Sequence, residues 1–309
     1  MAHDPLSLAD LLIINDKNLA DLEISDVLDE SPVLKALTAD VASNGTQHKY
    51  TKQTGAPVVG FRAVNVGREL DSSVDTAVTL NLQILDASFQ VDLALANGYG
   101  KGPAALVAKE GKRHLAAAMF GAERQIFYGV GADAGGFVGL ADATHLNGLA
   151  DEMVVSATGA TALTSVYLLR SPTTKDGVCI IGGNDGKIDI DETVVIQARD
   201  GDGKVYPALW TPVTAWLALQ IAGARDVARI ANIGTAAGKT LTDALIYEAM
   251  SRMPKKPTHI AMNRRSREQL RKSRTATNAT GQPAPTPEDV EGVPILCTDA
   301  IINDETAVE

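Results

Sequence analysis

Residues 102–129 read GPAALVAKEGKRHLAAAMFGAERQIFYG, and this stretch has the pattern of one long helix. Pro103 suits the first helical position, where the missing N–H would have no partner anyway, and Gly129 suits a left-handed stop. A stripe of apolar residues recurs at helical spacing between charged ones, which predicts one buried face. It consists of Leu106, Leu115, Met119, Ala122 and Ile126. At full length the helix would be roughly 40 Å long, enough to cross a domain as its spine.

The composition is that of a large globular chain, with 309 residues, 45% apolar content and only 4% aromatic residues. This balance favours sheet-rich packing around a few helices. Cys179 and Cys297 lie far apart without metal-ligand spacing, which predicts two reduced thiols in a cytoplasmic setting. The start lacks a basic region followed by an apolar core, and no apolar run reaches membrane-spanning length. We therefore expect neither secretion nor a membrane partner.

A long hairpin is predicted before the spine helix. Residues 74–84 alternate apolar and polar side chains without a break, which is typical of a strand at the upper end of usual length. We expect its partner over Pro57–Asn65, joined to it by polar turn material from Gly67 to Ser73. Such a hairpin would project from its domain and need a second surface to lie on.

The chain before the hairpin is expected to be an arm. Ser31 and Pro32 suit the cap and first turn of a helix that Asn44 and Gly45 would end. The preceding segment, Leu6–Leu28, has no sustained period. Two interpretations of it stay open: an arm that lies on another molecule, or a frayed terminus.

Strands and helices are predicted to alternate after the spine. Turn clusters separate five strand-like pieces: Ser165–Leu169, Gly177–Ile181, Thr193–Ala198, Lys204–Leu209 and Val213–Ile221. Thr242 suits the cap of a helix that runs to about Met253, and Pro257–Met262 is typical of a strand. Asn263 then caps an arginine-rich helix that runs to Arg274.

Several motifs approach those of enzymes without completing them. The segment that ends in Lys239 has three residues between glycines where a phosphate loop needs four. Asp189 and Asp191 have the spacing of a phosphatase pair but precede a strand instead of ending one. Asp200 and Asp202 open like a calcium loop that lacks its glycine and final glutamate.

The remaining glycines and histidines give no further motif. The glycines after the spine follow a helix, whereas a dinucleotide fingerprint follows a strand. The five histidines form no sequence-local metal pair. We therefore expect no enzyme, with no catalytic residue, no cofactor and no metal.

The basic run from Arg264 to Arg274 has two interpretations. It can contact nucleic acid phosphates, or it can be a solvated helix face that pairs with surplus acids. The second is favoured because no aromatic residues interleave to stack on bases, and because the net charge is −10.

Taken in order, several stretches resemble the major capsid proteins of tailed double-stranded DNA bacteriophages. Residues 57–67 resemble the extended loop of one capsid subfamily, Val91–Ala96 the lead into its spine, and Phe137–Leu140 the exit from the spine. Trp216–Ile233 resembles a segment of the axial domain. Residues 262–264 and 292–296 resemble the closing part. The resemblance covers nearly the whole chain.

This resemblance implies an α+β fold of the Hong Kong 97 type. It divides the chain into an N-terminal arm (1–46), an extended β-hairpin loop (47–75), a peripheral domain (76–138) with spine helix 102–129, an axial domain (139–287), and a C-terminal strand and tail (288–309). It also implies a homo-oligomer of hexamers and pentamers, assembled in the host cytoplasm into an icosahedral virion shell. That shell would enclose double-stranded DNA without sequence-specific binding.

Other partners follow from the same resemblance. A separate scaffolding protein is expected because no long charged helical extension precedes the arm, together with a portal protein and possible decoration proteins. Assembly should use ion pairs between subunits, and the candidates are Arg62, Arg68, Arg225 and Arg229. For each, the alternative is a local surface pair worth at most about 1 kcal/mol.

Two competing functions stay open at this point. A nanocompartment shell of the same fold would enclose cargo proteins instead of a genome. A phosphate-loop nucleotide hydrolase using Lys239 is the alternative from another class.

Overall fold

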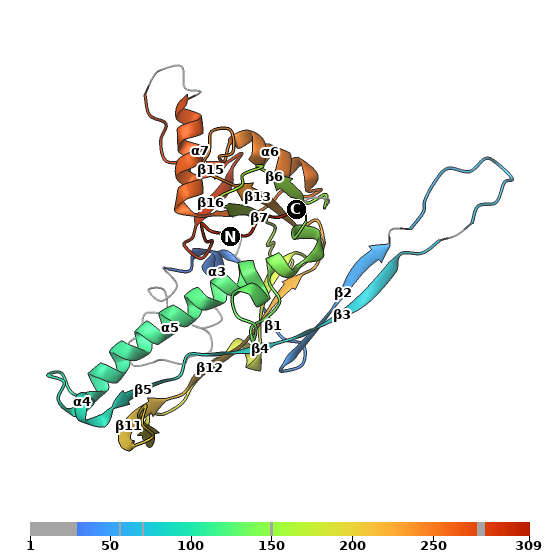
Figure 1. Ribbon diagram of the computed structural model, residues 1–309. Helices are drawn as coiled ribbons and strands as arrows, with labels where there is room; N and C mark the ends of the chain where they lie inside the picture. The colour runs from blue at the N-terminus through green and yellow to red at the C-terminus, as the bar shows by residue number, and fades with distance from the viewer. Residues whose placement is uncertain (1–29, 56, 70, 149–150, 277–281) are drawn as a thin grey trace, which may run out of the picture.

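The computed structural model describes residues 30–55, 57–69, 71–148, 151–276 and 282–309. Figure 1 shows an elongated molecule, in which helix α5 (Pro103–Tyr128) runs from a small sheet at one end to a helix-covered sheet at the other. A hairpin of β2 (Gln47–Gly55) and β3 (Val74–Asn81) points away from this body. The molecule thus has the expected mixed architecture with a long helix and a projecting hairpin.

Helix α5 begins and ends at the glycines that the sequence indicated. Gly102 has a φ of 89° and Gly129 a φ of 50°, both in the left-handed region that favours glycine. A β-carbon on Gly129 would also overlap the Asp142 carboxylate. The predicted stripe is buried throughout: Leu106, Leu115, Met119, Ala122 and Ile126. A short helix, α4 (Leu93–Asn97), leads into α5.

Two sheets lie along α5, which contacts β4 and β5 directly. The larger has the order β1-β8-β12-β4, with β9 also paired to β12, and only the β1–β8 pair is parallel. The smaller has the order β10-β11-β5 and is antiparallel. Their strands are β1 (Ala39–Val41), β4 (Gln83–Asp86), β5 (Phe89–Asp92), β8 (Val178–Gly182), β9 (Ile188–Ile190), β10 (Val194–Arg199), β11 (Val205–Thr211) and β12 (Val213–Ile221).

The third sheet has six strands in the order β15-β16-β14-β7-β13-β6. They are β6 (Val154–Ser156), β7 (Thr164–Leu169), β13 (Val227–Ile233), β14 (His259–Met262), β15 (Asp289–Val290) and β16 (Val293–Cys297). Helix α6 (Asp243–Arg252) packs on β13 and β6, and α7 (Arg264–Ala276) lies beside the β15 and β16 end (Figure 1). Asn263 caps α7 as predicted, because its Oδ1 accepts the Ser266 N–H at 2.8 Å.

The predicted hairpin pairing is wrong in one strand. The partner of β3 is Gln47–Gly55, whereas Pro57–Asn65 lies in the connecting loop and forms no strand. The alternating run also divides at Leu82, which is buried: β3 pairs with β2, and β4 pairs with β12. One continuous pattern therefore serves two sheets, since the same alternation suits both.

The predicted helix after Ser31 is shorter than expected. Helix α3 spans Pro32–Ala36, and the chain then turns into β1, which pairs with β8. Val33, Leu34 and Leu37 are fully buried in the main core. This part of the expected arm therefore packs on its own chain, while residues 1–29 lie outside the described residues.

Glu123 joins α3 to α5 at a buried junction. Its Oε2 accepts the backbone N–H groups of Val33 and Leu34, both at 2.8 Å, and its Oε1 accepts the Thr298 hydroxyl. Burial raises the pKa of Glu123 to about 7, against the opposing effect of these donors. One carboxylate thus ties together the N-terminal segment, the spine helix and the end of β16.

The raised pKa of Glu123 predicts a specific pH dependence. Its folded-state pKa lies above the ordinary glutamate value of 4.5, so its contribution to stability is present at low pH and is lost as pH rises to about 7. Glu123→Gln keeps the shape without the titration. The free energy of unfolding of the variant relative to the wild type should rise between pH 5 and 8, by on the order of 3 kcal/mol.

Urea unfolding of the unassembled chain at several pH values measures this difference. Glu288→Gln, at an exposed site, is the matched control and should show no comparable trend. A Glu123→Gln difference that is the same at pH 5 and pH 8 would contradict the assignment.

Candidate assembly interface

The loop at the tip of the hairpin is held in shape by polar contacts. Arg68 donates to the Val58 carbonyl at 2.9 Å, and Asp71 accepts the Val58 N–H at 3.2 Å. Gly60 lies against the Arg68 guanidinium, where a β-carbon would come within 2.8 Å of Nη1. The tip therefore has a defined backbone although it forms no strand.

This tip presents apolar side chains to solvent. Phe61 is 107% exposed, Val59 84% and Val64 87%. Further exposed apolar residues of the hairpin are Val58, Val66 and Val74. Exposed apolar residues of this number in one place mark an interaction surface, since soluble monomers rarely leave them together in water.

The base of the hairpin is fixed to the body by polar side chains. His48 donates through Nε2 to Gln220 Oε1 at 2.9 Å, and Tyr50 donates to the Ile221 carbonyl at 3.2 Å. Gln220 in turn donates to the Lys175 carbonyl at 3.0 Å. These contacts set the direction in which the apolar tip points.

The four arginines predicted to form intersubunit pairs lie in different environments. Arg62 and Arg68 are both exposed on the tip loop, where Arg62 reaches the Val66 carbonyl at 3.5 Å. Arg225 forms an exposed pair with Glu152 of the same chain at 2.8 Å. Arg229 is only 5% exposed, which does not suit an intersubunit ion pair.

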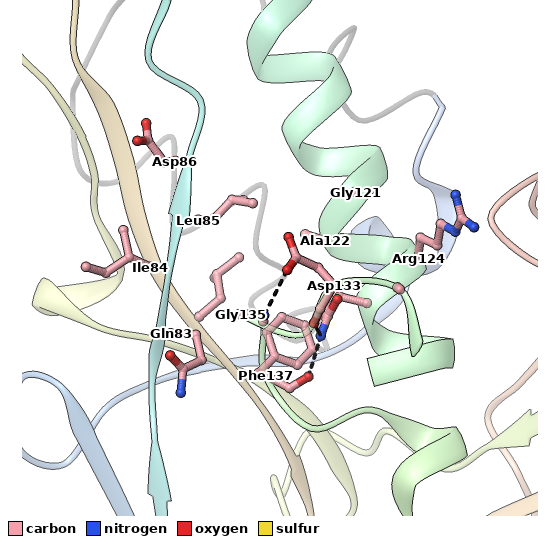
Figure 2. Close-up of a pocket in the computed structure, with 14 residues that line it drawn as sticks. Gln83, Ile84, Leu85, Asp86, Gly121, Ala122, Arg124, Asp133, Gly135 and Phe137 are labelled. Carbon is pink, nitrogen blue, oxygen red and sulfur yellow. Dashed lines mark hydrogen bonds between the residues drawn. The ribbon is translucent and has the colours of Figure 1, made fainter. Parts of the chain in front are cut away.

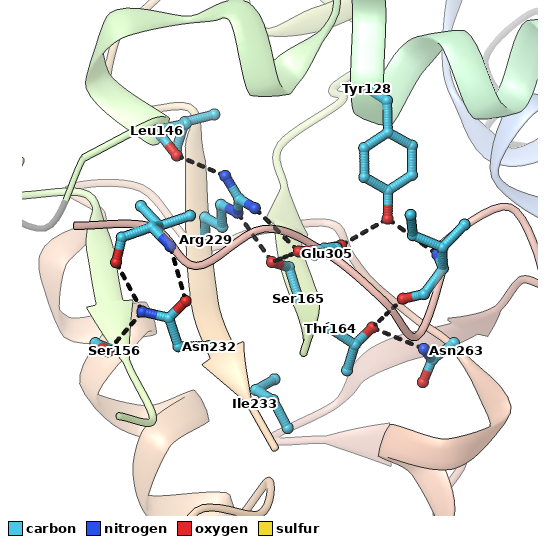
Figure 3. A network of polar contacts seen from close by, with 12 residues as sticks. Tyr128, Leu146, Ser156, Thr164, Ser165, Arg229, Asn232, Ile233, Asn263 and Glu305 are labelled. Carbon is cyan, nitrogen blue, oxygen red and sulfur yellow. Dashed lines mark hydrogen bonds and ion pairs between the residues drawn. The ribbon is translucent and has the colours of Figure 1, made fainter. Parts of the chain in front are cut away.

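Arg229 belongs to a buried network that fastens the C-terminal tail (Figure 3). Its guanidinium donates to Glu305 Oε2 and to Ser165 Oγ, both at 3.0 Å. Tyr128, at the end of α5, donates to Glu305 Oε1 at 2.6 Å. Burial and the Glu305 carboxylate raise the pKa of Tyr128 far above its usual value, which keeps the hydroxyl a donor.

The expectation for Arg229 is therefore corrected: its partners are on its own chain. Asn232 extends the attachment, donating to the Val308 carbonyl at 2.8 Å and accepting its N–H at 2.9 Å. Glu305 was not predicted, because 76 residues separate it from Arg229 and no local pattern links the two.

A pocket of about 440 Å³ lies between α5, β4 and the loop after the spine (Figure 2). Gln125 holds this loop by donating to the carbonyls of Asp133 and Phe137, at 3.2 and 2.7 Å. The Asp133 carboxylate accepts the Gly135 N–H at 2.8 Å. These polar groups therefore shape the loop.

The incomplete enzyme motifs found in the sequence make contacts within the chain itself. The loop before α6 closes on itself, since Gly234 donates to the Lys239 carbonyl at 2.9 Å, and the Lys239 ammonium donates to Thr158. Those groups are not directed at a phosphate. Asp189 accepts from Asn184 at 2.7 Å beside a turn.

The basic run on α7 pairs with acids of the same chain. Arg264 lies 2.8 Å from Asp299, and Arg274 lies 2.8 Å from Asp243. The interpretation as a helix face that pairs with surplus acids is confirmed at these two arginines. Within the described ranges, no helix is long and apolar enough to span a bilayer, and no three potential metal ligands are gathered.

Comparison with protein families places these features in a known group. The family model described as major capsid protein GP7 matches residues 16–309. The chain belongs to this family. This major capsid protein is a structural component of a bacteriophage head shell built from many copies, and it is not an enzyme. Its location is the virion capsid.

Solved structures confirm the fold of this major capsid protein. A chain from the structure of bacteriophage epsilon15 has a TM-score of 0.64 and 20% identity, over 100% of this chain and 98% of that one. The capsid of bacteriophage JBD30 has a TM-score of 0.53 and 8% identity, over 93% and 97%. Both support the predicted Hong Kong 97 type of fold. A comparison with curated proteins gives no match.

Removing the Arg229 guanidinium should destabilise the subunit strongly. Arg229→Met leaves the buried Glu305 carboxylate without its cation, which typically costs about 3–5 kcal/mol. Arg225→Met removes an exposed pair instead and should cost less than about 1 kcal/mol. Urea unfolding of the unassembled chain measures both, and equal losses would contradict the difference in roles.

Proposed function

We propose that this capsid protein assembles as hexamers and pentamers into a closed icosahedral shell around double-stranded DNA, with its hairpin lying on a neighbouring copy. The observation that carries this proposal is the exposed apolar tip on a projecting hairpin. Burying one phenylalanine side chain contributes about 1.5–3 kcal/mol, and every subunit would supply such a contact. The single chain offers the tip no surface, because the hairpin points away from the body (Figure 1).

We assign the parts of the shell as follows. The hairpin within 47–75 is the extended loop, and residues 76–138 with α5 form the peripheral domain. Residues 139–287 form the axial domain, and 288–309 complete it through β15, β16 and the tail. Residues 1–46 are the arm, although 31–42 pack on the chain's own core. Placing β16 beside β14 supports joining the C-terminal segment to the axial sheet.

The proposed partners beyond further copies are a separate scaffolding protein, a portal protein and possible decoration proteins. DNA would be enclosed without sequence-specific contacts. The net charge of −10 and the pairing of the α7 arginines with acids support this view, since both weaken attraction to phosphates. Arg62 and Arg68 remain the proposed intersubunit cations. For Arg225 to act in the same way, it would have to exchange Glu152 for an acidic residue of a neighbouring copy.

Electron microscopy of the expressed chain, alone and with a scaffolding protein, tests the proposal. Closed hollow particles are expected. Protein-filled particles without DNA from infected cells would favour a nanocompartment. Chains that stay monomeric in every condition would overturn the proposal.

Loss of the apolar tip should block assembly without unfolding the subunit. Phe61→Ser combined with Val59→Ser removes two side chains that contact water in the free chain, so the circular dichroism spectrum should not change. Shell yield should fall at least about tenfold, as for loss of a central aromatic anchor. Tyr247→Ser, at an exposed aromatic on α6, is the control and should keep normal yield.

A further inference from the structure

One side of α5 carries a row of exposed residues along the middle of the helix. Its members follow one another at intervals of three or four residues, so they share one side of the helix: Lys109, Arg113, Ala117, Gly121 and Arg124. This side is opposite to the buried Leu115 and Ile126. At 1.5 Å per residue the row is about 22 Å long. We call it the α5 row.

The charged members of the α5 row are all cations. Within the described part of the chain, Lys109 and Arg124 are exposed and have no ion-pair partner. Arg113 pairs with Glu110 at 2.8 Å but keeps 59% of its side chain exposed. The other acid of α5, Glu123, is fully buried. The row is therefore a positive surface on a chain whose net charge is −10.

The α5 row offers a partner no apolar anchor. Helix α5 is described over its whole length, and none of its large apolar side chains is exposed. Ala117 and Gly121 keep the middle of the row low, and the space around Gly121 is open. A protein partner, including the leucine-rich segment before residue 30, would need apolar surface to bury. A polyanion needs only cations and space, so the row suits a polyanion better.

The proposed shell encloses such a polyanion. Duplex DNA carries one negative charge per about 1.7 Å of its axis. Subunits with a net charge of −10 would repel it unless the surface that faces it is locally positive. The arginines of α7 are less suited to this task, because Arg264 and Arg274 pair with Asp299 and Asp243.

We propose that the α5 row faces the inside of the shell and contacts the phosphates of the enclosed DNA. The inference rests on the proposed function and names the surface of the subunit that meets the DNA. Figure 2 shows that Arg124 extends away from Asp133, so this nearby acid does not engage it. Contacts to phosphates carry no sequence information, so the row would bind DNA of any sequence.

Photo-cross-linking in particles purified from infected cells tests the location. A photoreactive benzoylphenylalanine in place of Ala117 should give covalent adducts with DNA. The same group in place of Gln90 is the matched control and should give none. Phe89 stacks on His114 of α5, so the next residue of β5, the exposed Gln90, faces the other side of the sheet.

The other outcomes separate this inference from the proposed function. Adducts at position 117 with a scaffolding protein or with residues 1–29, and none with DNA, would overturn the inference. DNA adducts at position 90 alone, or at neither position in DNA-filled particles, would also overturn it. Absence of DNA-filled shells from the unmodified protein would instead overturn the proposed function, and this inference with it.

Charge reversal gives an independent measurement. Lys109→Glu with Arg124→Glu should lower the ratio of DNA-filled to empty particles at least about fivefold, because each change places a carboxylate against phosphates. The circular dichroism spectrum of the unassembled chain should not change, since both side chains are exposed. Arg199→Glu with Lys204→Glu, at exposed positions beside the turn between β10 and β11, changes the net charge equally and should keep the ratio. Equal ratios in the two double variants would overturn the inference.

Discussion

Burial of the apolar stripe of α5 is the constraint on which the rest of the subunit depends. Leu115, Met119, Ala122 and Ile126 lie on one face of the second half of the helix, and Leu106 is buried nearer its start, so elements far apart in the chain share one core. Polar groups then fix what packs there: Glu123 holds α3, and Tyr128 holds the C-terminal tail through Glu305. Both ends of the described chain are thereby tied to one rigid helix.

In the hairpin this arrangement is reversed, because polar groups hold it to the body and apolar groups face the solvent. Its base is held by directional bonds from His48 and Tyr50, and its tip carries the apolar residues. A subunit built this way has a core of its own but leaves apolar surface exposed at the tip, so a copy that covers this surface would add stability by mass action. The distribution of polar and apolar groups separates folding from assembly along one chain.

Elements set by a local sequence pattern were predicted correctly. Features that depend on contacts with residues far along the chain were not. Val213–Ile221 and the ends of α5 were correct, because alternation, proline and glycine act within a few residues. Strand β2 was missed, since its largely polar sequence gave no apolar signal. Pro57–Asn65 was mistaken for a strand because its valines suit a strand by composition, although they are exposed in the tip loop. Arg229 could not be placed without Glu305, which is 76 residues away.

Net charge limits how such subunits can associate. Each copy carries −10, so copies repel one another at long range, and this repulsion weakens as salt screens it. A contact that buries apolar surface does not weaken with salt, whereas an arginine–carboxylate pair at its edge does. In the proposed assembly, burial of the apolar tip supplies an attraction that opposes this repulsion. Because the attraction is concentrated at the end of a hairpin, a small change in the angle at its base would move the tip far. The polar bonds of His48 and Tyr50 to the body therefore fix where the tip points.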